Sequence, residues 1–295
     1  MIKRPFFKIV TILFLLLECF GCDKKVDNIE SHSYTFNEIL WCQSGDVTKE
    51  DNKVLIDYSN ASEGYILVKT KTSDHSRLKV MILKDDSKYT YDLNKDLEFE
   101  SFPLNMGDGT YNVKVYENIQ DDEYGLLFSE DIEVSLDNEF VPFLYPNQVV
   151  DYDSSTKCIE KSFELVKDDT TDLDRVDHIY HWVLDNVTYD WDKVEEVQGK
   201  YVLPVLDDIY DEGKGICFDY AAIMAAMLRV QHIPTKVVTG MVSEGYHAWI
   251  EVYIENMGWI KPHVYFNSGE WTQMDPTYDA MNREYDGDYS IKYTY

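Results

Sequence analysis

The feature that most constrains this chain is a run of alanine, methionine and leucine that follows closely after a cysteine. Gly213 and Gly215 mark a turn before Cys217, and residues 221–228 are strong helix formers. Cys217 should therefore stand at the first turn of a buried helix. There, unpaired backbone N–H groups and the partial positive charge of the helix start favour the thiolate, the form of cysteine that attacks carbonyl groups.

Two downstream residues have contexts that suit partners for this thiol. His247 opens an apolar strand after a turn-like stretch, and Asp275 precedes Pro276, which marks a strand end. Taken singly, the three residues could be a small buried thiol, a strand-end histidine and a turn-forming aspartate. Their order, with gaps of 30 (247 − 217) and 28 (275 − 247) residues, favours a nucleophile, a base and an orienting acid.

The segments around these residues resemble the core of the transglutaminase-like superfamily, the papain-fold group with its site in the order Cys, His, Asp. The resemblance runs from about Thr171 to Pro276. Outside that range, the N-terminus resembles that of bacterial lipoproteins. Its motifs lie at residues 186–190, 213–228, 245–253 and 274–276.

This resemblance implies roles for the three residues. Cys217 would be the nucleophile, His247 the general base and acid, and Asp275 the group that holds the imidazole. It implies no single reaction, because members include cross-linking transglutaminases, proteases, amidases and inactive binding modules.

Two further polar residues lie near the expected nucleophile. Tyr189 ends a predicted helix and could supply a second oxyanion donor beside the backbone N–H of Cys217, although a packed tyrosine is the alternative. Asp219, two residues after Cys217, is expected to face away from it as a solvent-facing or capping group.

The first 22 residues resemble an export signal that ends in a lipidation motif. Three basic residues precede a nine-residue apolar run that is too short to span a bilayer. Residues 19–22 resemble a bacterial lipobox, so Cys22 is the expected lipidation site. We therefore expect an extracytoplasmic protein anchored to a bacterial membrane, with residues 23–33 as a polar spacer. Cleavage as an ordinary signal, followed by secretion, is the alternative.

The formal net charge of −28 restricts the partners. So acidic a chain repels nucleic acid and anionic lipid, so membrane contact is expected only through the lipid. The substrate that the resemblance implies is a protein or peptide, including cell-wall peptide. No cysteine or histidine cluster has zinc spacing and no glycine-rich phosphate loop occurs, so no metal or cofactor is expected. Cys42 and Cys158 could pair in an oxidising exterior, but the sequence leaves this open.

The fold class expected is α+β, with two domains. Residues 34–145 contain short apolar or alternating runs between turn formers, the pattern of a β-sandwich. In residues 111–118, for example, Tyr111, Val113 and Val115 should share one face. Residues 146–295 would form the papain-like transglutaminase core, in which helices pack on an antiparallel sheet.

Together these features predict an extracytoplasmic thiol enzyme that acts on peptide or glutamine amide bonds. Hydrolysis is favoured over cross-linking because water needs no second binding site. The alternatives are a non-catalytic surface-binding protein and a structural protein of the envelope with the same fold, in which the sandwich would be the active part.

Overall fold

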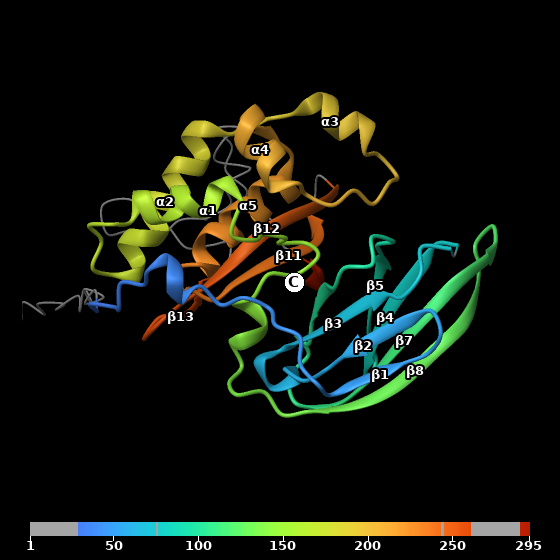
Figure 1. Cartoon of the computed structure of the whole chain (residues 1–295). Helices are drawn as coiled ribbons and strands as arrows, with labels where there is room; N and C mark the ends of the chain where they lie inside the picture. The colour runs from blue at the N-terminus through green and yellow to red at the C-terminus, as the bar shows by residue number, and fades with distance from the viewer. Residues whose placement is uncertain (1–28, 75, 243–244, 261–289) are drawn as a thin grey trace, which may run out of the picture.

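The N-terminal half of the protein is a β-sandwich, as the alternating runs predicted. The computed structural model describes residues 29–74, 76–242, 245–260 and 290–295. Two antiparallel four-stranded sheets face each other, with strand orders β1-β2-β3-β6 and β5-β4-β7-β8 (Figure 1). Their bounds are β1 Thr48–Glu50, β2 Val54–Asp57, β3 Tyr65–Thr70, β4 Leu78–Lys84, β5 Ser87–Leu93, β6 Glu100–Pro103, β7 Gly109–Gln120 and β8 Glu123–Val134.

Strand β7 shows why these residues form a sandwich. Tyr111, Val113 and Val115 are fully buried between the sheets, whereas Asn112 and Lys114 alternate with them on the other face. Successive side chains of a strand point to opposite faces, so this alternation supplies one apolar face per strand. The predicted face of this strand is confirmed.

In the C-terminal lobe, helices pack against another four-stranded antiparallel sheet. Strands β11, β12, β13 and β14 form an antiparallel sheet in the order β13-β12-β11-β14, and β9 pairs in parallel with β10. The helices are α1 Lys157–Leu165, α2 Asp172–Asn186, α3 Trp191–Glu196, α4 Leu206–Glu212 and α5 Cys217–Arg229. The strands are β9 Thr188–Tyr189, β10 Lys214–Gly215, β11 Thr235–Val242, β12 Gly245–Ile254, β13 Gly258–Ile260 and β14 Ser290–Thr294.

Helix α5 is the centre of this lobe. From Tyr220 to Leu228 every residue is fully buried, and the helix packs against α1, α2, α4, β11 and β12. A helix that is apolar on all sides is stable only when other elements surround it. The predicted buried helix, and with it the α+β class, is confirmed.

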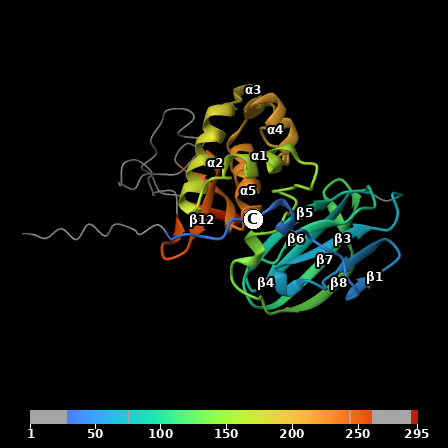
Figure 2. The same cartoon turned by 60° about the vertical axis from the view of Figure 1, so that its left-hand side comes forward.

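The two lobes are joined through Arg229, the last residue of α5. Its guanidinium is fully buried and donates to main-chain oxygens of Thr235, Tyr145 and Tyr295, at 2.8 to 3.0 Å. Burial lowers the pKa of Arg229 to about 10. Figures 1 and 2 both show residue 295, marked C, at the junction of the lobes.

The segment before the sandwich lies against the helical lobe. The backbone N–H of Ser31 donates to the Thr170 oxygen at 2.8 Å, and the buried Arg175 of α2 bonds Ser31 and Ser33. The short helix η1 (Phe36–Glu38) follows on the same side (Figure 1). The last five residues of the expected spacer, 29–33, are therefore ordered against α2.

The cysteines of the two lobes do not form a bridge. Cys42, Cys158 and Cys217 are all free thiols. The thiol of Cys42 lies instead 3.2 Å from the Ser101 hydroxyl. In the described part of the chain, no helix has the length and apolarity needed to cross a membrane.

Candidate active site

A short parallel ribbon, formed by β9 and β10, precedes the start of α5. In this ribbon Gly215 of β10 pairs with Tyr189 of β9, and the backbone N–H of Asp190 donates to the Gly215 oxygen at 2.9 Å. Gly213 ends α4 with a φ of +61°, and a Cβ there would lie 2.9 Å from the Asn186 oxygen. Glycine is the residue that adopts this left-handed turn without strain. Cys217, partly exposed, is then the first residue of α5.

Asp219 organises this helix start. Its carboxylate accepts the backbone N–H of Ile216 at 2.9 Å and forms an ion pair with Lys193 of α3 at 2.7 Å. The predicted capping role is therefore confirmed. The alternative of a solvent-facing group is wrong, since Asp219 is only 2% exposed. The carboxylate fixes the backbone just before the nucleophile candidate and holds α3 beside it.

His247 lies within strand β12 rather than at its first residue. It is 7% exposed, and its ring stacks near that of Trp249 with centroids 6.3 Å apart. The residue opposite it on β11 is Gly240, where a Cβ would approach the Ser290 oxygen to 2.1 Å and Trp249 to 3.0 Å. Glycine at this position lets β14 and the Trp249 indole lie close to β11, the strand beside that of His247.

The chain directions bring Cys217 and His247 to the same end of the lobe. Arg229 at the end of α5 bonds Thr235, which pairs with Val252 of β12. Back from there, Cys217 is twelve residues away along the helix (229 − 217), or about 18 Å. His247 is five residues back along the strand (252 − 247), or about 17 Å. Because α5 also packs against β12, we infer from these similar distances that the two residues lie toward the same end of the lobe.

Tyr189 belongs to the ribbon that precedes Cys217. Its ring is 4.7 Å from that of Trp191 and 6.4 Å from that of Tyr220, whose hydroxyl donates to the Val187 oxygen. The packing of its ring agrees with the packed alternative. A role of its hydroxyl as an oxyanion donor stays a prediction. Asp275, the expected orienting acid, and Cys22, the expected lipidation site, lie outside the described residues.

The other two described cysteines have a different environment from Cys217. Burial raises the pKa of Cys42 to about 12 and that of Cys158 to about 12. A thiol that stays protonated is a poor nucleophile, so neither suits a role in acyl transfer. The described residues also hold no group of three or more histidine, cysteine or carboxylate side chains arranged to bind a metal ion.

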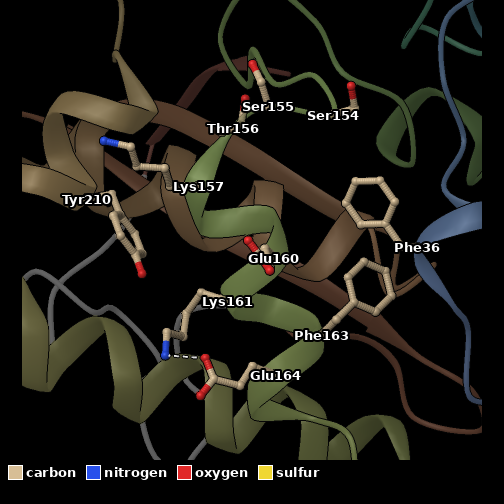
Figure 3. Close-up of a pocket in the computed structure, with 10 residues that line it drawn as sticks. All are labelled: Phe36, Ser154, Ser155, Thr156, Lys157, Glu160, Lys161, Phe163, Glu164 and Tyr210. Carbon is tan, nitrogen blue, oxygen red and sulfur yellow. Dashed lines mark hydrogen bonds and ion pairs between the residues drawn. The ribbon is translucent and has the colours of Figure 1, made fainter.

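A separate hollow lies over α1, with a volume of about 810 Å³. Figure 3 shows Phe36 and Phe163 on one side of it and Lys161, bonded to Glu164, on the other. Its second lysine, Lys157, pairs with Asp211 at 2.5 Å. Neither Cys217 nor His247 lines this hollow, which is therefore distinct from the candidate active site.

The helical lobe is similar to a known protein family. Residues 160–276 match the family model described as the transglutaminase-like superfamily, and this match includes α5 and β12. The chain carries a transglutaminase-like core. The match begins within α1, so the family likeness concerns the helical lobe rather than the sandwich.

Solved structures were also compared with the chain. A presumptive cysteine protease from Cytophaga hutchinsonii is 17% identical with a TM-score of 0.37, over 79% of this chain and 86% of its own. A TGase is 24% identical with a TM-score of 0.30, over 35% of this chain and 28% of its own. Red sea bream transglutaminase is 14% identical with a TM-score of 0.29, over 77% of this chain and 56% of its own. Scores this low carry no argument about activity. No curated protein matched the chain.

Sequence reasoning missed one feature of the transglutaminase-like core, the buried pair of Asp219 and Lys193. The signal was present, since an aspartate at the third position of a helix is a common acceptor for the N–H before it. The lysine partner lies 26 residues earlier (219 − 193), and no local pattern links the two.

Proposed function

We propose that this protein is a cysteine-dependent amide hydrolase or acyltransferase, with Cys217 as nucleophile, His247 as general base and acid, and Asp275 as the acid that orients His247. The observation that supports this most is the position of Cys217. It is a partly exposed thiol at the first residue of a buried helix, and that helix packs against the strand of the buried His247.

In the proposed reaction, His247 takes the thiol proton and the Cys217 sulfur attacks the carbonyl carbon of an amide. The oxygen of the tetrahedral intermediate accepts the backbone N–H of Cys217, with the Tyr189 hydroxyl as a proposed second donor. The C–N bond breaks as His247 gives its proton to the leaving amine or ammonia, which leaves a thioester. Water then attacks the thioester, releases the carboxylic acid and restores the thiol.

We favour hydrolysis of a peptide or glutamine amide over cross-linking, because water needs no second substrate site. The two outcomes leave different products. Hydrolysis of a glutamine side chain gives glutamate with the mass shift of deamidation, whereas transfer to a lysine gives dimers that resist denaturant. A glutamine-containing test protein, incubated with and without a fluorescent primary amine, separates the two by mass spectrometry and gel.

Variants test the assignment of roles. We expect His247→Ala to cost about as much activity as Cys217→Ala, because members of such a set act as one unit. Asp275→Asn should leave a measurable remnant, because the oxyanion donors and substrate binding still act. The measurement is kcat/KM on any amide that is turned over. Full activity in His247→Ala would mean that the protein has the fold without this chemistry and would favour a non-catalytic binding role.

For location, we propose an extracytoplasmic protein anchored by a lipid on Cys22, with secretion as the alternative. The support is the sequence alone: the apolar run and the lipobox-like residues 19–22. A lipidated protein should partition into detergent, and Cys22→Ser should abolish this. A free mature N-terminus at Lys24 or later would contradict lipidation.

A further inference from the structure

Several large aromatic side chains of the helical lobe face solvent. Trp191 at the start of α3 is 57% exposed and Tyr246, next to His247 in sequence, is 55% exposed. Tyr201, on the loop between α3 and α4, is 51% exposed. Exposed aromatic side chains that gather near one site are typical of an interaction surface rather than of ordinary surface scatter.

Trp191 is attached firmly to the helix of Cys217. Its ring packs on that of Tyr189, which belongs to the ribbon before Cys217. Two residues on, Lys193 of the same helix pairs with Asp219 in the first turn of α5. These contacts hold α3 beside the nucleophile candidate, so a chain that binds along α3 would lie next to Cys217.

The loop that leads from α3 to α4 carries Tyr201. In Figure 1 this loop descends from α3 toward the sandwich.

The region of α3, the following loop and α4 is strongly acidic. Residues 190–212 contain eight acidic and two basic side chains, a net charge of −6 (2 − 8). One of the two basic residues, Lys193, is already neutralised by Asp219. The exposed carboxylates of α3 are Asp192, Glu195 and Glu196. Glu195 lies one turn after Trp191, so it flanks the exposed indole.

We propose that the α3 surface, formed by Trp191, Asp192, Glu195 and Glu196, binds a cationic polypeptide segment and presents it to Cys217. An exposed indole attracts a lysine or arginine head over its face and packs against the aliphatic stem of the same side chain. Carboxylates around the indole pair with the charge and steer its approach. The substrate class is therefore a peptide or protein rich in lysine or arginine with interspersed apolar side chains. The presentation to Cys217 rests on the proposed function, whereas the binding does not.

Binding is measured on the Cys217→Ala protein, so that no turnover is needed. The probe is a short fluorescent peptide rich in lysine and leucine, and the comparison peptide carries glutamate in place of each lysine. We expect the lysine peptide to bind at low ionic strength and to weaken as the Debye length shortens from about 30 Å at 0.01 M salt to about 3 Å at 1 M. The glutamate peptide should not bind.

Two sets of charge-removing variants locate the site. Asp192→Asn, Glu195→Gln and Glu196→Gln together remove three charges from α3, and we expect affinity to fall roughly tenfold. The matched control is Asp121→Asn, Asp122→Asn and Glu123→Gln, at the turn between β7 and β8 of the sandwich. It changes the net charge equally and should alter affinity less than about twofold.

Trp191→Ala tests the apolar part of the surface and should weaken the lysine peptide without changing the net charge. Equal losses in the α3 set and the control set would overturn the proposal, because the peptide would then be responding to overall charge. Equal binding of the two peptides would also overturn it. A Cys217 protein that binds the lysine peptide but cleaves no amide would leave this proposal standing and count against the proposed function alone.

Discussion

At the scale of single residues, position distinguishes one thiol from two others of the same chain. Burial raises the pKa of Cys42 and of Cys158 to about 12, whereas Cys217 is the first residue of α5. We expect iodoacetamide near neutral pH to label Cys217 in the folded protein and to leave Cys42 and Cys158 unmodified until the protein unfolds. Peptide mapping after a short reaction measures this. Labelling of all three at similar rates would show that Cys217 has no special reactivity.

A second prediction at this scale concerns the Asp219 carboxylate. Asp219→Ala removes the acceptor of the Ile216 N–H and leaves Lys193 without its partner, so we expect a loss of about 2 kcal/mol in the free energy of unfolding. Labelling of Cys217 should change as well, because the backbone before it is released. Urea unfolding measures the first effect. Asp192→Ala, an exposed carboxylate of α3, is the control and should stay within about 0.5 kcal/mol of the parent.

At the scale of elements, the sequence predicted those parts whose cause is local. The composition of residues 221–228 determines the buried α5, and the alternation around Tyr111 to Val115 determines the face of β7. What it could not predict depends on contacts between distant residues. Arg175 bonds Ser31, 144 positions earlier, and no periodicity marks that pair. Local patterns also predicted the residue types at the candidate site. They did not predict the ion pair by which Lys193 holds the start of α5.

The docking of the N-terminal segment on the helical lobe should depend on pH. His232, between α5 and β11, stacks on Tyr34 with centroids 3.7 Å apart, and its Nε2 donates to the Glu38 oxygen at 2.7 Å. Burial lowers the pKa of His232 below its usual 6.5, with the Glu38 contacts acting in the opposite direction. The unfolded state then binds more protons than the folded state at acidic pH. The contribution of His232 to the free energy of unfolding is therefore complete above pH 6.5 and is lost as pH falls through and below that value.

His232→Asn tests this contact, since asparagine tolerates the positive φ of 57° at this position. The loss in unfolding free energy relative to the parent should be larger at pH 8 than at pH 5. His181→Asn, at an exposed position of α2, is the matched control and should change the free energy of unfolding by less than about 0.5 kcal/mol at pH 8. The pH dependence contributed by His178 has the opposite sign. Its bond to Asp169 at 2.8 Å raises its pKa, so its contribution to stability declines as pH rises. A difference for His232→Asn that grows toward low pH would contradict the assignment.

At the scale of the whole molecule, the sandwich and the transglutaminase-like core are connected through buried polar contacts rather than through a loose linker. Asn105 of the sandwich bonds the Thr294 oxygen, and the Thr294 N–H donates to the Tyr89 hydroxyl at 3.2 Å. Tyr89 also packs on Tyr293, with ring centroids 5.4 Å apart. A β14 strand that contacts both lobes means that a disturbance of the sandwich is transmitted to the sheet of His247. This favours a role of the sandwich in holding that sheet.

The bonds of the buried Arg229 are the strongest of these connections between the lobes. Arg229→Met keeps the length of the side chain but leaves the oxygens of Tyr145, Thr235 and Tyr295 without their buried donor, each at a cost of about 1–3 kcal/mol. Because these oxygens belong to the linker after the sandwich, to β11 and to the residue after β14, the loss falls on the joint between the lobes. We expect one cooperative unfolding transition in the parent and two separated transitions in Arg229→Met, measured by calorimetry. Arg77→Met, which removes a surface guanidinium paired with Asp92, should preserve the single transition. If Arg229→Met instead unfolds in one step at a lower temperature, the lobes are coupled by their apolar contacts and Arg229 only adds to the stability of the whole.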